Sequence, residues 1–222
     1  MIKLSKDHLI QFHKPTYRIK SKQLNIMYRK YFKSIIDWII AFIALIILFP
    51  IFLLVAIAIK LDSKGPVFFR QERLGYKGKV FTIYKFRTMK VDQIENDVNH
   101  KLFENDPRIT RIGRFIRKTS IDELPQLFNI LKGEMSFIGP RPPLTYFPKK
   151  INEYNEFEKQ RFYVKPGISG LAQIRCREEH DWNVNIPIDI EYVQNFSIKN
   201  DINLFVKSLF SFFRTNNIYS KE

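Results

Sequence analysis

The stretch Trp38–Ile59, WIIAFIALIILFPIFLLVAIAI, contains no charged side chain. A helix of this length, rising about 1.5 Å per residue, can cross a hydrocarbon core of about 30 Å. The polar region before it is too long for a cleaved signal peptide, and no small-residue cleavage site precedes Lys60–Asp62. The sequence therefore predicts a membrane helix, and the rest of the chain is interpreted around it.

Two features of this stretch bear on how it enters a membrane. Pro50 lies inside it, where proline removes a backbone hydrogen bond and kinks or breaks a helix. Both flanks are basic, which disfavours moving either one across the bilayer. The basic residues are Lys14, Arg18, Lys20, Lys22, Arg29, Lys30 and Lys33 before it, and Lys60, Lys64, Arg70, Arg73, Lys77 and Lys79 after it. A re-entrant helix–break–helix over residues 31–60 satisfies both features. A kinked single span is equally compatible, since membrane helices tolerate proline.

The composition also favours a membrane surface. Lys and Arg number 37 against 22 Asp and Glu, a formal net charge of +15, and the chain holds 21 Phe. Such a charge favours a polyanionic partner, whereas phenylalanine contributes nothing to phosphate binding. No familiar nucleic-acid motif is present and the basic residues are spread along the chain, so a nucleic-acid partner is not expected. The single cysteine, Cys176, excludes an internal disulfide and fits a reducing compartment.

Outside the apolar stretch, we expect a basic N-terminal arm over residues 1–30 and one domain over residues 61–222. The predicted class is α/β, helix-rich, with a small β-hairpin or sheet. Two strands are predicted over Pro66–Gly75 and Gly78–Arg87, around a glycine-containing turn. A surface loop or helix is predicted over Val91–Glu104, and a rigid loop over Gly139–Pro143. Helices are predicted over Arg111–Lys118 and over Asp122–Leu131, with Ser120 as the N-cap of the second. An exposed helix is predicted over Asn152–Arg161.

The C-terminal part has a second apolar pattern. Apolar residues recur there at helical spacing: Ile202, Phe205, Val206, Leu209, Phe210 and Phe213. The helix either packs against the core or lies as an amphipathic helix in the membrane interface, which its phenylalanines and flanking basic residues favour.

The block Arg114–Pro142, RFIRKTSIDELPQLFNILKGEMSFIGPRP, is the densest motif. Its adjacent carboxylates, Asp122 and Glu123, diverge by about 100° on a helix and so can take different roles. Mg²⁺ binds one or two carboxylates together with substrate phosphates, and arginine binds phosphate through two parallel donors. A carboxylate nucleophile forms an acyl phosphate, which remains activated for a second transfer. The same residues are also compatible with a solvated helix start beside an ordinary basic face.

Four further motifs accompany this block. They are Lys60–Arg73 (KLDSKGPVFFRQER), Tyr84–Met89 (YKFRTM), Asn105–Gly113 (NDPRITRIG) and Val164–Gln173 (VKPGISGLAQ). With them, the chain from about Tyr31 to Asn217 resembles the bacterial sugar transferases. These are monotopic phosphoglycosyl transferases that begin glycan assembly on undecaprenyl phosphate. Two departures stand out: Phe49 replaces the serine that many relatives have before the proline, and Cys176 replaces a usual glycine. The Cys176 loop is either a determinant of sugar choice or a variable surface loop.

The resemblance implies a mechanism and a location. Asp122 would attack the sugar-linked phosphorus of a UDP-sugar, release UMP and pass the phospho-sugar to a polyprenyl phosphate. Glu123 would hold Mg²⁺ together with Asp122. Four basic residues would bind substrate phosphates: Arg117, Arg141, Lys85 and Arg87. Pro50 would break a re-entrant helix, with the body on the cytoplasmic face of the bacterial inner membrane. The alternative is a non-catalytic, basic adaptor on the membrane surface, which would need the positive charge but not the carboxylate pair.

Overall fold

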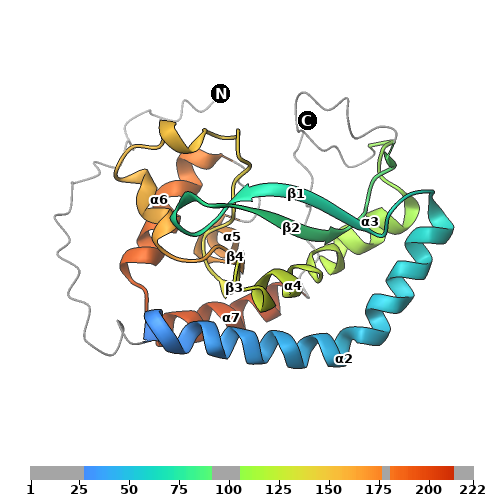
Figure 1. The fold of residues 1–222 in the computed structure, drawn as a ribbon, viewed down its shortest axis with the longest axis horizontal. Coiled ribbons are helices and arrows are strands. Elements are labelled where there is room, and N and C mark those ends of the chain that lie inside the picture. Colours follow the sequence, from blue (N-terminus) through green and yellow to red (C-terminus); the bar gives the residue numbers. More distant parts are fainter. Residues whose placement is uncertain (1–27, 92–105, 177–180, 213–222) are drawn as a thin grey trace, which may run out of the picture.

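The computed structural model describes residues 28–91, 106–176 and 181–212. The predictions for most of the basic arm 1–30, for Val91–Glu104 beyond Val91, and for Phe213 lie outside these residues. The first described element is a short π-helical turn, Tyr28–Phe32, which leads directly into the long helix α2, Lys33–Asp62 (Figure 1).

Helix α2 is the predicted apolar helix. Among the described helices it alone is long and apolar enough to cross a membrane. It continues through Pro50 and bends along its length (Figure 1), so the prediction of two helices separated by a break is not confirmed. A proline within a helix removes its own hydrogen bond and leaves the rest of the ladder in place, which gives a bend.

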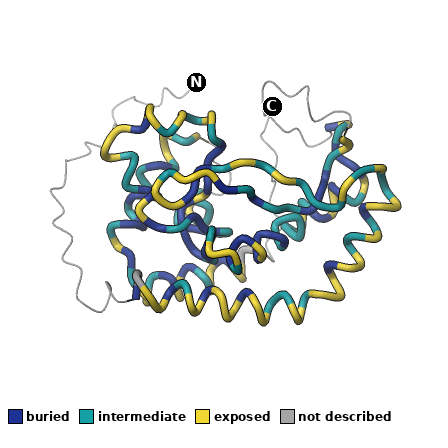
Figure 2. Tube along the Cα trace, viewed as in Figure 1, coloured by how far each residue is buried: buried dark blue, intermediate teal, exposed yellow. Residues whose placement is uncertain are grey.

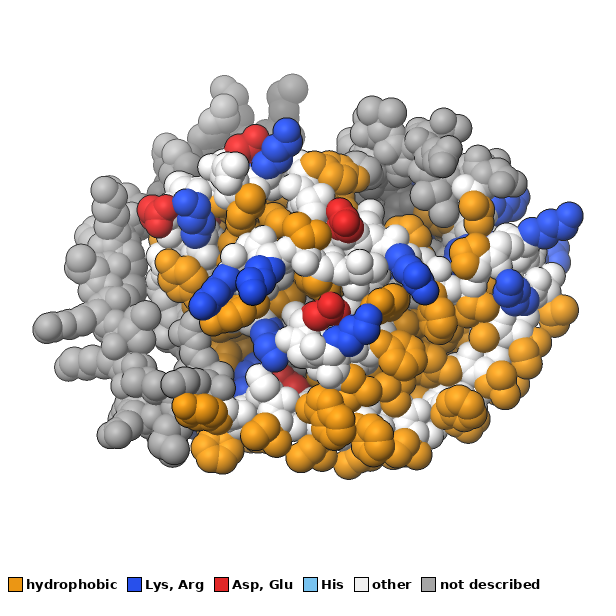
Figure 3. Space-filling view, viewed as in Figure 1, with side chains coloured by type: hydrophobic (Ala, Val, Ile, Leu, Met, Phe, Trp, Pro, Cys, Tyr) orange, Lys and Arg blue, Asp and Glu red, His pale blue; other side chains and the backbone are white. Residues whose placement is uncertain are grey.

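One side of α2 covers the body and the other faces outward (Figure 2). Ala41, Phe52 and Ile59 are buried against the hairpin and the helices that follow it. The outward side is unusually apolar, and Ile47, Phe49 and Leu54 are each about two-thirds exposed. Hydrophobic side chains line this edge of the molecule in Figure 3.

Polar groups attach the start of α2 to the body. At its start, the Lys33 Nζ lies 2.7 Å from the Asp201 carboxylate and 3.6 Å from Asp37. The hydroxyl groups of Tyr28 and Tyr192 donate to Asp201 at 2.8 Å and 2.7 Å. A further donation, from the Ser136 hydroxyl to Asp37 at 2.6 Å, joins this end to the region before the Gly139 loop. We call these six residues the anchor network.

The predicted hairpin is confirmed. Strands β1, Phe68–Leu74, and β2, Val80–Phe86, are antiparallel, and Phe68 pairs with Phe86. The turn η2, Tyr76–Gly78, contains two residues with positive φ, Lys77 and Gly78. A second, very short parallel sheet joins β3, Ser136–Ile138, to β4, Gly167–Ser169.

The helices between these strands are shorter than the sequence predicts. Helix α3, Arg111–Lys118, agrees with its prediction and is capped by Thr110. The helix predicted over Asp122–Leu131 is wrong in its first part: η4, Ile121–Glu123, is a 3₁₀ turn, and α4 covers only Gln126–Leu131. Ser120 has a left-handed backbone (φ 55) and makes no cap. Since Pro125 has no N–H to donate, it fits the start of α4 and separates it from η4.

The exposed helix predicted over Asn152–Arg161 is also wrong. The chain there forms two 3₁₀ segments, η5, Ile151–Glu153, and η6, Glu158–Tyr163. Arg161 is buried in an ion pair with Asp189, with 2.6 Å between the charged groups. Such a pair requires a distant partner, and sequence spacing alone does not reveal one.

The last described elements are three helices: α5, Leu171–Arg175, α6, Trp182–Gln194, and α7, Ile198–Phe212. Of the two predicted alternatives for α7, packing against the core is confirmed. Asp201, Leu204 and Ser208 face the body and are buried. Ile202 and Phe210 face outward with 58% and 69% of their surfaces exposed. The helix therefore packs against the core and presents a second apolar face.

Candidate active site

The carboxylate pair lies on the 3₁₀ turn η4. The left-handed Ser120 turns the chain sharply after α3, and Pro125 ends the turn before α4 begins. Asp122 and Glu123 are consequently presented on a short, constrained segment between two helices, both half-buried. The segment also packs against strand β2, which carries Lys85.

Glu123 is held by positive charges. Its Oε1 lies 2.7 Å from the Lys85 Nζ and 3.8 Å from the Arg141 guanidinium. Burial favours the neutral acid, but the charges of Lys85 and Arg141 outweigh it and lower the pKa of Glu123 to about 2. Glu123 is therefore a permanent anion at neutral pH.

Asp122 is in the opposite situation. Among the described residues, no hydrogen bond or ion pair engages its carboxylate. Burial raises the pKa of Asp122 to about 6; the Glu123 charge adds to the rise, while the charges of Lys85, Arg117 and Arg141 oppose it. The pair thus consists of one ionised carboxylate that is ion-paired, Glu123, and one carboxylate without a hydrogen bond or ion pair, Asp122. This is the arrangement expected of an orienting group beside a nucleophile.

Three arginines approach the pair from different elements. Arg117 extends from α3 and donates from its Nε to the Thr88 hydroxyl at 2.7 Å. Arg141 is about half exposed on its loop. Arg73, at the end of β1, donates to the Pro142 carbonyl at 3.1 Å, and its pKa falls to about 10 because it is buried and lies near Arg141. Arg73 was not among the predicted site residues; the available signal was its place in the motif Lys60–Arg73.

Arg87 lies elsewhere. It is 2% exposed, and its guanidinium donates to the carbonyl groups of Ser63 (2.7 Å), Lys64 and Ile59 at the end of α2. Alternation along a strand suggests that Lys85 and Arg87 share one face, but Arg87 lies just beyond the end of β2 at Phe86. Arg87 therefore secures the second end of α2 instead of joining the phosphate-binding set.

The loop that carries Arg141 is held by a close backbone crossing. A Cβ built on Gly139 would collide with the Lys165 carbonyl, and one built on Gly167 would collide with the Gly139 nitrogen. Hydrogen bonds connect the Gly139 nitrogen to the Ser169 carbonyl (2.9 Å) and the Gly167 nitrogen to the Pro140 carbonyl (3.0 Å). Two motifs far apart in sequence, Gly139–Pro142 and Val164–Gln173, are thus parts of one structural unit that positions Arg141.

The acidic residues suit a divalent cation that is shared with a substrate. Within the described residues, no group of three or more His, Cys, Asp and Glu side chains forms a complete protein cage. Mg²⁺ commonly takes one or two carboxylates and completes its shell with phosphate oxygens and water. The free Asp122 carboxylate and the second oxygen of Glu123 provide such a donor set, and the raised pKa of Asp122 indicates that added positive charge would be favourable there.

Comparison with known proteins places the chain in a family. The model of the bacterial sugar transferase family matches residues 28–215, which include every motif described above. The chain belongs to the bacterial sugar transferase family. Its resemblance to that family, inferred from the motifs, is thereby confirmed.

The chain is similar to several curated family members. It is 43% identical over 183 residues to the UDP-glucose:undecaprenyl-phosphate glucose-1-phosphate transferase of Xanthomonas campestris, covering 78% of this chain and 37% of the relative. It is 40% identical to galactosyl transferase CpsE of Streptococcus agalactiae, covering 90% and 43%. It is 39% identical to a UDP-glucose:undecaprenyl-phosphate glucose-1-phosphate transferase of Caulobacter vibrioides, covering 84% and 72%. The first two relatives are more than twice as long as the part matched by this bacterial sugar transferase.

Proposed function

We propose that this protein transfers a sugar 1-phosphate from a UDP-sugar to a polyprenyl phosphate, such as undecaprenyl phosphate, and so begins a glycan on a lipid carrier. The names of the relatives support the donor and acceptor classes. The observation that carries the chemistry is the contrast within the carboxylate pair: Glu123 is ion-paired with Lys85, whereas Asp122 has no partner. The enzyme alternative is favoured over the adaptor, because an adaptor has no use for an unpaired, half-buried carboxylate.

In the first step, an Asp122 carboxylate oxygen attacks the sugar-linked phosphorus of the donor. A bond forms between this oxygen and phosphorus, and the bond to the bridging oxygen breaks, so UMP leaves with the electron pair. The positive charges of Arg141, Arg73 and Arg117 offset the repulsion between the carboxylate and the diphosphate. No proton transfer is needed, because nucleophile and leaving group are both oxyanions.

In the second step, an oxygen of the lipid phosphate attacks the same phosphorus. The acyl phosphate bond to Asp122 breaks, the carboxylate is restored and the product is a polyprenyl diphosphate sugar. Glu123 and Lys85 remain an ion pair throughout and keep the turn η4 in place. A Mg²⁺ ion held by Asp122 and Glu123 would supply further charge neutralisation at the phosphate oxygens.

The proposed setting is the cytoplasmic face of the bacterial inner membrane, with α2 as a re-entrant helix. Supporting this topology, both ends of α2 attach to the same body: Lys33 pairs with Asp201, and the carbonyls near Asp62 accept from Arg87. The Asp62 carboxylate also accepts from the Ile112 backbone at 2.9 Å. A helix whose two ends join one polar body enters and leaves through one leaflet more readily than it spans. The apolar outward faces of α2 and α7 would then lie in lipid.

The decisive experiment uses the donor alone. Purified protein in detergent is incubated with a UDP-sugar, without acceptor, and analysed by intact-protein mass spectrometry and UMP assay. We expect one phospho-sugar adduct per chain, mapped to Asp122, with stoichiometric UMP. The Asp122→Asn variant forms neither, and excess chelator suppresses both in the native protein. Absence of an adduct and of UMP, in protein that turns over when acceptor is added, would refute the covalent mechanism.

A further inference from the structure

The loop that carries Arg141 has few means of holding its own shape. Pro140, Pro142 and Pro143 have no N–H group to donate, so the loop is fixed mainly through its carbonyl groups. Each of the four carbonyl groups from Pro140 to Pro143 accepts a hydrogen bond from another segment. In chain order, the donors are the Gly167 nitrogen, the Arg161 guanidinium, the Arg73 guanidinium and the Leu74 nitrogen. The shape of the loop therefore depends on donors that are distant in the sequence.

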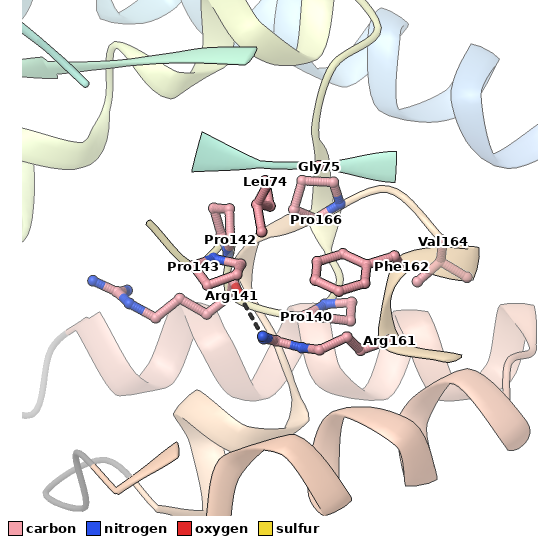
Figure 4. Close-up of a pocket in the computed structure, with 10 residues that line it drawn as sticks. All are labelled: Leu74, Gly75, Pro140, Arg141, Pro142, Pro143, Arg161, Phe162, Val164 and Pro166. Carbon is pink, nitrogen blue, oxygen red and sulfur yellow. Dashed lines mark hydrogen bonds between the residues drawn. The ribbon is translucent and has the colours of Figure 1, made fainter. Parts of the chain in front are cut away.

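The donor to the Arg141 carbonyl is a buried cation with an anchor of its own. The Arg161 Nη2 donates to the Arg141 carbonyl at 2.8 Å (Figure 4) and to the Asp189 carboxylate at 2.6 Å. Asp189 lies on α6, and both charged side chains are almost completely buried. The guanidinium of Arg161 also lies over the rings of Trp182 and Phe162, 5.0 Å and 5.5 Å from their centroids. A carboxylate and two aromatic rings thus fix the donor in place.

Stability alone does not account for this buried pair. Apolar residues of similar volume often stabilise a fold as well as a buried ion pair does, because burial removes both charges from water. Burial raises the pKa of Asp189 to about 6, although the charge of Arg161 opposes the rise. Within the described residues, the second Asp189 oxygen, Oδ1, has no hydrogen-bond partner. A pair with these costs calls for a further role, and the group that it holds is the backbone of Arg141.

The place of the Arg141 backbone matters because its side chain reaches the carboxylate pair. The Arg141 guanidinium lies 3.8 Å from Glu123, and in Figure 4 its side chain points away from Arg161. About half of the Arg141 side chain is exposed, so packing restrains it little. Its position beside Glu123 therefore depends on where the loop places the backbone.

We propose that Arg161, anchored by Asp189, is a positioning residue, which fixes the backbone of Arg141 so that its guanidinium meets the donor phosphates beside Asp122. This inference rests on the proposed function, since that function supplies the donor. It extends the framework of the active site from the loop through η6 to α6. The close crossing at Gly139 holds the loop just before Arg141, and Arg161 holds it at Arg141 itself.

A double-variant cycle tests whether Arg161 acts through Arg141. Arg161→Met combined with Asp189→Leu removes both buried charges and keeps the apolar bulk, so the fold should survive. UMP release from a radiolabelled UDP-sugar is measured with the full chain in detergent. We expect kcat/KM to fall between about tenfold and a hundredfold, the scale of a small misplacement. The division of the loss between kcat and KM should match that of Arg141→Ala.

The same pair of substitutions is then made in the Arg141→Ala variant, which keeps the carbonyl that accepts from Arg161. There we expect no further loss of kcat/KM, because the side chain to be positioned is absent. An equal loss with and without the Arg141 side chain would mean a general structural effect and would overturn the proposal. No loss in the chain that retains Arg141 would overturn it as well.

Hydrogen exchange tests the same restraint without any activity. The double variant should exchange faster than the native protein on peptides containing Gly139–Leu144 and at the native rate on α4. Unchanged exchange in the loop overturns the proposal. A native protein that releases no UMP in the donor-alone experiment refutes the proposed function instead, and the exchange result still decides the positioning role. If the double variant fails to fold, Asp189→Asn carries both measurements, with the same expected directions and the same overturning outcomes.

Discussion

The chain contains two clusters of charged groups that are built differently. In the anchor network, the Asp201 carboxylate accepts hydrogen bonds from Lys33, Tyr28 and Tyr192. In the carboxylate pair, Lys85 serves Glu123 and leaves Asp122 without a partner. The first cluster joins helices, and its polar groups bind one another within the protein. The second retains an unsatisfied group, which is what a reaction with an external substrate requires.

The largest expected effect comes from breaking the anchor network. Lys33→Met would leave the carboxylates of Asp37 and Asp201 buried without their cation. We expect a loss of about 3–5 kcal/mol in the free energy of unfolding, because an uncompensated buried charge is costly. Chemical unfolding in detergent, followed by tryptophan fluorescence, measures it.

The double variant Lys33→Met, Asp201→Asn serves as its control. It removes one of the stranded charges, so part of the lost stability should return. If the two substitutions were simply additive, the network would not be a coupled unit.

A smaller effect, of opposite sign, is expected at Asp122. Its pKa of about 6 lies above the ordinary value for an aspartate, so its charge costs stability once the pH rises through about 6. Asp122→Asn removes this cost, and we expect a gain of about 1–2 kcal/mol at pH 7.5 together with the loss of transfer activity. The gain should shrink as the pH falls through about 6 and disappear below about 4, where Asp122 is protonated in both the folded and the unfolded chain. Thermal unfolding at the two pH values checks this.

Glu123→Gln provides the matched control. The pKa of Glu123 is lowered to about 2, so its negative charge stabilises the fold at pH values above the ordinary pKa of a glutamate. This stabilisation is lost as the pH falls toward 2. The variant should be less stable than the native protein at pH 7.5, opposite to Asp122→Asn. Two variants that shift stability in the same direction would contradict the division of roles within the pair.

A third prediction concerns the pH dependence of the reaction. The nucleophile must be ionised, so the rate should fall as the pH drops through about 6. The charge of Lys85 lowers the pKa of Asp122, so Lys85→Met should move this fall to higher pH, by an amount on the order of one pH unit or 1.4 kcal/mol. The pH profile of kcat/KM measures the shift. An unchanged midpoint, with only the plateau reduced, would mean that Lys85 does not control ionisation of Asp122.

The smallest effect is expected for a surface pair that belongs to neither cluster. Glu156 lies 2.7 Å from Lys159, but its side chain is 84% exposed. Solvent screens such a pair, so Glu156→Ala should change the free energy of unfolding by less than about 0.5 kcal/mol and leave transfer activity unchanged. A loss of more than about 1 kcal/mol in the same unfolding assay would contradict this expectation. It would mean that an exposed ion pair stabilises the fold as well as a buried one does, so burial would not explain the larger effect at Lys33.

The local sequence predicted those features that depend on local pattern. The apolar run predicts α2, and the glycine-containing turn predicts the β1–β2 hairpin. The helix predicted over Arg111–Lys118 is α3. The adjacency of Asp122 and Glu123 to basic residues identifies the candidate site, and Lys85 and Arg141 lie beside Glu123.

The remaining features depend on contacts between distant segments. Arg73 and Arg161 are directed by partners more than twenty residues away, and Arg87 donates to carbonyl groups at the end of α2. The left-handed Ser120 turns the chain before Asp122, a conformation that serine adopts only when its surroundings require it.

The attachment of α2 at both ends also has a mechanical consequence. Lys33 at one end and the Arg87-bound carbonyls at the other make the apolar helix a rigid strut of the body, and not a tether. In the proposed membrane setting, the height of the Asp122 carboxylate above the lipid is then fixed by how deeply α2 sits. A thicker or thinner bilayer would raise or lower the whole enzyme as one piece, and so change its reach toward a carrier phosphate whose own height follows the headgroups.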